Sequence, residues 1–327
     1  MVRAVGIAGT GTALPERILT NADLEKMVDT SDEWIRTRTG ICQRYIADAD
    51  TATSDLAAAA AREALAAAGT KPEEVDLILV ATASPDMLFP STACFVQAKL
   101  GAARAAAFDL SAGCTGFLYG LTTGAQFIRT GMYDTVLVIG AETLSKLVNW
   151  KDRSTCVIFG DAAGAAVLKP TETGKGFLSF VLGADGSGGD LLKVPAGGSR
   201  LPATAETVAA GQHYIHMAGN EVFKFAVRAM GDAALAAIAK AGLTKADIDY
   251  LIPHQANSRI IDASVRRLEI AREKVHINLN NFGNTSSASV AVALDEALRD
   301  GKVKPGDRIV MVAFGAGLTW GATVMEW

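Results

Sequence analysis

Short apolar runs alternate with longer amphipathic stretches along the chain. The runs LILVATA (77–83) and TVLVIGA (135–141) are continuous and have polar flanks, which is typical of strands buried on both faces of a sheet. The alanine-rich segment LAAAAAREALAAAG (56–69) is long and amphipathic, as expected of a helix that covers such a sheet. The alternation predicts an α/β protein with mixed sheets covered by helices.

The same order of elements occurs twice. A helix at 56–69 and a helix at 226–242 each lead into an apolar strand, a turn of small residues, a second helix and a further strand. In both halves 58 residues separate the aspartates that precede the two strands: Asp76 and Asp134 in the first, Asp249 and Asp307 in the second. Equal order at equal spacing predicts a duplicated α/β unit.

Glycine and proline positions suggest where the two units join. The polar segment KPTETGKG (169–176) separates the two patterns, so we expect an N-terminal half at 1–170 and a C-terminal half at 171–327. The glycine-rich start GIAGTG (6–11) has the wrong glycine order for a dinucleotide-binding loop, and we interpret it as a tight turn between strands.

Composition excludes several classes of function. A formal net charge of -4 over 327 residues argues against a nucleic-acid-binding protein. The apolar runs are too short to span a bilayer, and the N-terminus lacks the pattern of a signal peptide, so a cytoplasmic protein is expected. Four widely spaced cysteines and four histidines form no C-x-x-C or zinc-ligand spacing, so neither disulfides nor a metal site is expected.

One cysteine stands among very small residues. Cys114 lies in SAGCTGFLYG (111–120), between an apolar run and an amphipathic one, where a strand-to-helix turn is expected. The N-terminus of a helix carries about half a positive charge and lowers the pKa of a thiol placed there. The sequence therefore predicts a nucleophilic thiolate, although a cysteine packed where nothing larger fits is about equally compatible with this stretch.

His254 and Asn284 are candidates to act with this thiol. His254 in IPHQANSR follows a predicted strand of the second half, and Asn284 in FGNTSS stands at the place in the repeat that Cys114 has in the first half. Taken singly, the histidine could cap a helix and the asparagine could form a turn. At the carboxyl ends of strands in a duplicated fold, the three together favour a Cys/His/Asn site.

Six motifs follow one another along the chain: TSDEWIRTRTGI (30–41), SAGCTGFLYG (111–120), IFGDAAGAAVL (158–168), PHQANSRII (253–261), NFGNTSSASV (281–290) and AFGAGLTWG (313–321). In this order they resemble one family, the initiating condensing enzyme of bacterial fatty-acid synthesis, β-ketoacyl-[acyl-carrier-protein] synthase III. The resemblance implies the thiolase fold, a duplicated five-layer α-β-α-β-α architecture, which agrees with the repeat.

The resemblance also implies a reaction. Cys114 would take the acyl group of an acyl-CoA primer, with acetyl-CoA the expected one, and release CoA. Malonyl-acyl carrier protein would then lose carbon dioxide, and its enolate would attack the thioester to give 3-oxoacyl-acyl carrier protein. His254 and Asn284 would stabilise the enolate oxygen as hydrogen-bond donors. Such an enzyme would be an acyltransferase that needs no cofactor, since acyl-CoA would be a substrate.

Further residues take roles only through this resemblance. The backbone amides of Cys114 and Ala316 would bind the thioester oxyanion, although some relatives have glycine at the Ala316 position. The remaining sets are the CoA-binding residues Trp34, Arg38 and Arg153, the acyl and malonyl pocket of Phe89, Leu144, Phe159, Met217 and Phe314, and the carrier-protein patch of Lys224, Arg259, Arg266 and Arg267. Phe89 would reach across a homodimer interface into the partner's acyl pocket.

Three other functions remain open from the sequence. A thiolase-fold relative that condenses other substrates, such as a hydroxymethylglutaryl-CoA synthase-like or long-chain acyl-CoA enzyme, would not need the carrier protein. A thioesterase-like cysteine hydrolase would release free acid without malonate. A catalytically silent homologue would bind without reacting. A papain-like protease is set aside because its C-G-S-C-W signature is missing.

Overall fold

The computed structural model describes residues 2–327 and contains two main sheets. The first has the strand order β1-β7-β6-β4-β5, in which β4 runs parallel to β5 and β6 while β7 runs antiparallel to its neighbours. Its strands are β1 (Val5–Ala13), β4 (Leu77–Ala81), β5 (Ala106–Leu110), β6 (Val136–Glu142) and β7 (Ala162–Pro170). The predicted buried strands at 77–83 and 135–141 are confirmed as β4 and β6.

The second sheet repeats most of this pattern. Its order is β11-β12-β13-β8, with β11 parallel to β12 and the other pairs antiparallel. Its strands are β8 (Gly176–Ala184), β11 (Tyr250–Pro253), β12 (Arg308–Gly315) and β13 (Thr319–Glu326). Two short pairs complete the strands: β2 (Arg17–Thr20) with β3 (Gln43–Ile46), and β9 (Leu192–Lys193) with β10 (His216–Met217).

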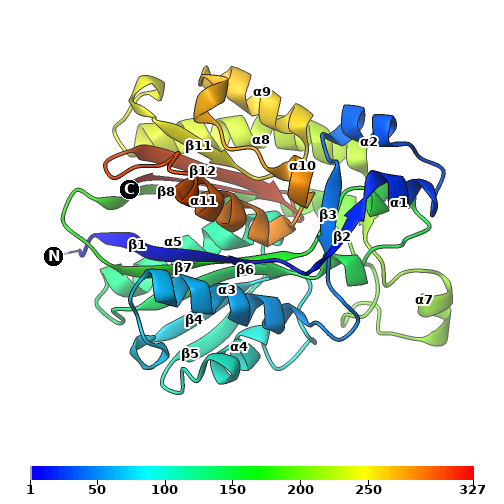
Figure 1. Ribbon diagram of the computed structural model, residues 1–327, viewed down its shortest axis with the longest axis horizontal. Helices are drawn as coiled ribbons and strands as arrows, with labels where there is room; N and C mark the ends of the chain where they lie inside the picture. Colours follow the sequence, from blue (N-terminus) through cyan, green and yellow to red (C-terminus); the bar gives the residue numbers. More distant parts are fainter. Residues whose placement is uncertain (1) are drawn as a thin grey trace.

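Helices separate and cover the two sheets in five layers, which Figure 1 shows from α9 at the top to α4 at the bottom. The helices are α1 (Asn21–Glu25), α2 (Asp32–Thr39), α3 (Thr53–Ala67), α4 (Thr92–Leu100), α5 (Gly116–Arg129), α6 (Arg153–Cys156), α7 (Ala205–Ala209), α8 (Gly219–Lys240), α9 (Ser258–Leu268), α10 (Leu279–Phe282) and α11 (Ser289–Arg299). Helices α5 and α11 lie between the sheets, α3 and α4 cover the first, and α8 and α9 cover the second.

Alternate residues of a single strand face two different helix layers. In β4, Leu77 and Leu79 contact the central layer, whereas Ile78 and Val80 contact the outer layer of α3 and α4. Both faces of the strand are therefore buried, which explains its continuous apolar run. None of the helices within residues 2–327 is long and apolar enough to cross a membrane.

The aspartates of the repeat have equivalent structural roles. The Asp76 carboxylate accepts the backbone N–H of Asp134 at 2.9 Å, and the Asp249 carboxylate accepts that of Arg308 at 2.9 Å. Each aspartate thus ties the start of one strand to the start of its parallel neighbour, which confirms the duplicated unit. The first sheet is built from residues 5–170 and the second from residues 176–326, while the boundary at 170/171 stays a prediction.

The prediction of a turn at 6–11 is wrong. These residues lie inside β1, where α3 packs directly on the strand backbone. A Cβ on Gly9 would lie 2.5 Å from the Ala68 nitrogen, and one on Gly11 would lie 2.4 Å from the Ala64 nitrogen. The glycines therefore serve the close approach of a helix and not a change of chain direction.

Candidate active site

Cys114 lies in a single 3-10 turn, Gly113–Thr115, between β5 and α5. Gly113 has a φ of 53°, in the left-handed region that glycine adopts without strain. The Thr115 hydroxyl donates to the Ala112 carbonyl at 2.6 Å and closes the turn. The expected strand-to-helix turn is confirmed, and it places the buried thiol at the start of α5.

The thiol opens into a cavity of about 200 Å³. Apolar side chains dominate the wall, with a few polar groups beside the thiol. The lining residues are Ala83, Ser111, Gly113, Cys114, Leu144, Leu147, Phe159, Leu192, Lys193, Val194, Ile215, Ser286 and Ala316. A small apolar space that ends at a thiol suits a short acyl chain.

Only some of the predicted pocket residues line this cavity. Leu144 and Phe159 line this cavity. Phe314 packs instead against the His254 ring, at 5.4 Å between ring centroids, and Met217 lies in β10 beside the cavity residue Leu192. Phe89 is 84% exposed in a surface loop of the single chain.

Asn284 is held by backbone pairing with the segment that carries Phe159. The Asn284 N–H donates to the Ile158 carbonyl at 2.9 Å, and the Gly160 N–H donates to the Asn284 carbonyl at 3.0 Å. The Ser286 N–H then donates to the side-chain oxygen of Asn284 at 2.8 Å. Because the amide oxygen is occupied, the Nδ2 group is the free end of this side chain and can only donate.

His254 follows β11 and is fixed from the backbone outward. Its N–H donates to the Val312 carbonyl at 2.8 Å, and its Nδ1 lies within hydrogen-bonding distance of the Ser289 hydroxyl. The ring is fully buried, and its Nε2 has no hydrogen-bond partner within residues 2–327. When Nδ1 accepts the Ser289 proton, the neutral ring carries its own proton on Nε2 and becomes a donor there.

Burial changes both titrating groups of the site. It raises the pKa of the Cys114 thiol to about 12, with the Glu142 carboxylate adding to the rise and the Ser286 hydroxyl opposing it. Burial also lowers the pKa of His254 to about 3. The prediction of a lowered cysteine pKa is therefore wrong, because desolvation outweighs the effect of the helix end.

Two backbone amides converge next to the thiol. A Cβ on Gly315 would lie 2.5 Å from the Cys114 nitrogen, and one on Gly113 would lie 2.7 Å from the Ala316 nitrogen. The two turns therefore pack backbone against backbone, and both sites need glycine. This close packing supports the expected pair of amide donors at Cys114 and Ala316.

A buried carboxylate that sequence reasoning missed joins the halves behind the thiol. Glu142 accepts the Ser84 hydroxyl at 2.6 Å, the Ser287 hydroxyl at 2.8 Å and the Ala83 N–H at 3.1 Å. Its partners come from two segments far from Glu142 and from each other in the sequence, 83–84 and 287, so no local motif could have indicated it. Within residues 2–327 no group of three His, Cys, Asp or Glu side chains is placed to hold a metal ion.

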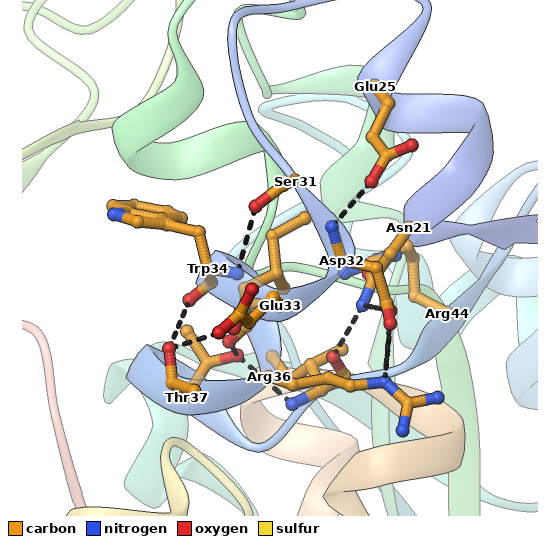
Figure 2. Close-up of polar contacts among 12 residues, drawn as sticks. Asn21, Glu25, Ser31, Asp32, Glu33, Trp34, Arg36, Thr37 and Arg44 are labelled. Atoms are coloured by element: carbon orange, nitrogen blue, oxygen red, sulfur yellow. Dashed lines mark hydrogen bonds and ion pairs between the residues drawn. The ribbon is translucent and has the colours of Figure 1, made fainter.

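The predicted CoA-binding residues meet on the surface around α2. The Arg153 guanidinium lies 5.3 Å and that of Arg38 lies 5.9 Å from the centre of the Trp34 ring. The Ser31 hydroxyl caps the helix by accepting the Trp34 N–H at 3.1 Å, as Figure 2 shows. An indole ring with two guanidinium groups close to it is suited to bind a nucleotide that carries phosphates.

The predicted carrier-protein residues lie on the neighbouring helices α8 and α9. Lys224 on α8 forms an ion pair with Glu221, and Arg267 on α9 forms one with Asp232. Arg259 stacks on the ring of Phe223 at 5.1 Å. Three of the four cations thus already contact neighbours, while the two helices pack side by side.

Comparisons with known proteins agree with this arrangement. Two family models match, the 3-oxoacyl-[acyl-carrier-protein] synthase III model over residues 108–186 and its C-terminal model over 238–327. β-Ketoacyl-[acyl-carrier-protein] synthase III of Caldanaerobacter subterraneus is 63% identical, covering 99% of this chain and 98% of its own. The same enzyme of Symbiobacterium thermophilum is also 63% identical, covering 100% and 99%.

A solved structure extends the likeness to three dimensions. The crystal structure of 3-oxoacyl-[acyl-carrier-protein] synthase III from Aquifex aeolicus superposes with a TM-score of 0.92 at 49% identity, covering 99% of this chain and 100% of the other. The thiolase-like fold expected from the repeat and the motifs is thereby confirmed. Sequence and fold agree, and the chain belongs to the β-ketoacyl-[acyl-carrier-protein] synthase III family.

Proposed function

We propose that the protein condenses an acyl-CoA primer with malonyl-acyl carrier protein, giving 3-oxoacyl-acyl carrier protein, CoA and carbon dioxide as the first step of fatty-acid synthesis. The observation that carries the proposal is the small apolar cavity at the Cys114 thiol, whose lining residues Phe159 and Ser286 both pair with Asn284. The neutral, buried His254 ring, whose Nε2 has no hydrogen-bond partner within residues 2–327, supports it. Family membership supplies the reaction class. The reaction needs no cofactor, because acyl-CoA is itself a substrate.

The first half-reaction transfers the acyl group to Cys114. The sulfur attacks the thioester carbonyl, the amides of Cys114 and Ala316 bind the oxyanion, and CoA leaves with the proton that the thiol gives up. Because burial raises the pKa of the Cys114 thiol to about 12, the thiol enters this step protonated and gives up its proton as the bond to carbon forms. A thiol that is protonated in the empty enzyme is also protected against oxidation.

The second half-reaction makes the carbon–carbon bond. Malonyl-acyl carrier protein loses carbon dioxide, and the Nε2–H of His254 and the Nδ2 group of Asn284 donate to the enolate oxygen that forms. The enolate carbon attacks the acyl-cysteine carbonyl, the carbon–sulfur bond breaks, and the cysteine sulfur takes up one proton. Phe159 lines the same cavity, and its apolar ring disfavours the malonyl carboxylate relative to carbon dioxide.

The two substrates would approach over different surfaces. Trp34, Arg38 and Arg153 would bind the adenine and phosphates of CoA by stacking and charge. Lys224, Arg259, Arg266 and Arg267 would attract the acidic carrier protein. Since several of these cations already pair with acids on the same helices, their contribution would be faster, salt-sensitive association.

A homodimer would account for the exposed apolar surface at the edge of the first sheet. Strand β5 forms that edge, and its Phe108 is 38% exposed, while Leu88 and Phe89 in the preceding loop are 78% and 84% exposed. An open sheet edge beside exposed apolar side chains favours pairing with a second copy of the chain. In such a dimer Phe89 would close the partner's acyl pocket.

Phe108→Glu is expected to convert the dimer into monomers, because it places a charge on the apolar edge that would be buried. Sedimentation velocity measures the change in mass. Ile18→Glu is the matched control, since Ile18 is 44% exposed on β2, far from β5 in Figure 1. A wild-type monomer, or a Phe108→Glu protein that stays dimeric, would contradict this interface.

The reaction itself is tested by supplying the substrates in turn. Exposure to a panel of acyl-CoAs followed by intact mass and peptide mapping is expected to show an acyl adduct on Cys114. Addition of malonyl-acyl carrier protein should convert the adduct into 3-oxoacyl-acyl carrier protein. Free acid without malonate would instead indicate a hydrolase, equal turnover with malonyl-CoA would indicate another condensing enzyme, and neither adduct nor product would indicate a silent homologue.

A further inference from the structure

Arg44 on β3 is a fully buried arginine outside the residues that contact substrate. Its guanidinium donates to the Val157 carbonyl at 2.7 Å, to the side-chain oxygen of Asn21 at 2.9 Å and to the Leu19 carbonyl at 3.2 Å. Figure 2 shows Arg44 beside Asn21 and Asp32. All its acceptors are neutral, and its Nε has no partner within residues 2–327.

Asn21 connects this guanidinium to the carboxylate of Asp32. While its side-chain oxygen accepts from Arg44, its Nδ2 donates to Asp32 and to the Ile41 carbonyl, each at 2.8 Å. Asp32 is the first residue of α2, which carries Trp34. The charge of Arg44 is therefore linked to the start of the CoA-binding helix through one amide. Burying a cation without a direct counter-ion costs free energy. The remaining contacts of Arg44 therefore indicate which part of the structure this residue stabilises.

Those contacts lead directly to Asn284. The Val157 carbonyl that Arg44 holds begins the short segment 157–160, and Ile158 and Gly160 of this segment make both backbone hydrogen bonds of Asn284. The stem of Arg44 also fills the space under the glycines on each side of this pairing. Its Cβ would lie 3.0 Å from a Cβ on Gly160 and 3.2 Å from one on Gly283.

Residues in β3 and directly before it support the segment 280–284, which carries Asn284. The Tyr45 ring stacks on that of Phe282 at 5.7 Å, and the Cys42 N–H donates to the Asn280 carbonyl at 2.9 Å. The segment 280–284 therefore rests on β3 along its length, with Arg44 at the end nearest Asn284. The contacts of Tyr45 and Cys42 involve no charged group. The guanidinium of Arg44 is needed only for the three hydrogen bonds that it donates.

We propose that Arg44 is a positioning residue for the condensation, whose buried guanidinium fixes Asn284 through Val157 and joins it, through Asn21 and Asp32, to the helix that carries Trp34. The inference rests on the proposed function of Asn284 as an enolate donor. Its consequence is selective: loss of the guanidinium should affect the half-reaction that uses Asn284 and leave acyl transfer to Cys114 largely intact.

Arg44→Met tests this consequence, because methionine fills much of the space without donating. Acyl-adduct formation and decarboxylation of malonyl-acyl carrier protein are measured separately, below the melting temperature of each variant. We expect decarboxylation to fall by on the order of 100-fold, the effect of a misplacement of about 1 Å, with acylation changed little. Arg129→Met is the matched control, since Arg129 also donates to a backbone carbonyl, that of Phe177, and also has an unpartnered Nε.

Two further variants keep the test decisive if Arg44→Met does not fold. Arg44→Lys retains the charge but cannot reach three acceptors at once, and it should give an intermediate decarboxylation rate. Asn21→Asp gives Arg44 a direct carboxylate but removes both Nδ2 donors and sets two acids side by side. We therefore expect decarboxylation within about twofold of wild type and a raised KM for acyl-CoA.

Equal losses in both half-reactions, or wild-type rates in Arg44→Met or Arg44→Lys, would overturn the positioning role. An unchanged KM for acyl-CoA in Asn21→Asp would overturn the link to α2. Failure of the wild-type protein to decarboxylate malonyl-acyl carrier protein would instead remove the proposed function, so the two failures are distinguishable.

Discussion

Cys114→Ala is expected to abolish acyl transfer from acyl-CoA and, with it, condensation. In the proposed reaction every later step proceeds through the cysteine thioester, and among residues 2–327 no other side chain that lines the cavity carries a thiol. Removal of a covalent nucleophile costs on the order of a million-fold in kcat. Intact mass after exposure to acyl-CoA measures the adduct, and product formation from malonyl-acyl carrier protein measures the overall rate.

Cys94→Ala provides the control for this variant, since Cys94 is an exposed cysteine on α4. It should form the adduct and turn over like the wild-type protein. An acyl adduct that persists in Cys114→Ala and moves on to the malonyl-derived carbon would place the nucleophile elsewhere. A folded Cys114→Ala protein without adduct, beside an active Cys94→Ala protein, would identify Cys114 as the acyl carrier.

His254→Ala and Asn284→Ala are expected to leave acylation largely intact and to slow decarboxylation by a factor of about 100–1000 each. The physical reason is that their Nε2–H and Nδ2 groups donate to an oxygen that becomes negatively charged only when carbon dioxide leaves. Release of carbon dioxide from malonyl-acyl carrier protein, measured separately from adduct formation, gives the comparison. Loss of acylation with decarboxylation retained would show that the two roles are assigned wrongly.

His276→Ala is the matched histidine control, because His276 is also buried but pairs with Glu296 at 3.2 Å outside the cavity.

The pH dependence of the rate gives a second readout. Since burial lowers the pKa of His254 to about 3, the ring stays neutral from pH 8 to pH 5 and its protonation should not reduce the rate over that range. In the unfolded chain the His254 ring has an ordinary pKa of about 6.5, so it binds a proton at pH values where the ring in the folded protein stays neutral.

That difference affects stability with a definite sign. Above pH 6.5 the histidine is neutral in both states and has no effect, whereas below it the unfolded state gains a proton and stability falls until the pH nears the folded pKa of about 3. The melting temperature should therefore fall less between pH 7 and pH 5 in His254→Ala than in the wild-type protein. An equal fall in both would indicate that His254 titrates in the folded state as it does in the unfolded one.

Much of the fold and the strand-to-helix turn at Cys114 could be predicted from the sequence because they are recorded locally. The strands β4 and β6 are buried on both faces, so their apolar runs are continuous, and the paired aspartates recur because each starts an equivalent strand pair. Small residues around Cys114 are likewise required by a turn whose backbone touches the Ala316 turn. Family motifs supplied the proposed roles of His254 and Asn284, which no spacing alone could assign.

Other properties were decided only by the tertiary structure, because they depend on segments far apart in the chain. The same glycines that suggest a turn at 6–11 instead admit α3 onto β1, a contact that sequence spacing does not record. The thiol at a helix start has a raised pKa and not a lowered one, because distant strands and Glu142 surround it and exclude water. Arg44 carries no motif, and its position beneath Asn284 arises only when β3 packs on the segment 280–284. Local pattern specifies which side of an element is buried, whereas packing specifies which group lies there, and it is the packed neighbour that sets pKa values, hydrogen bonds and the position of a donor.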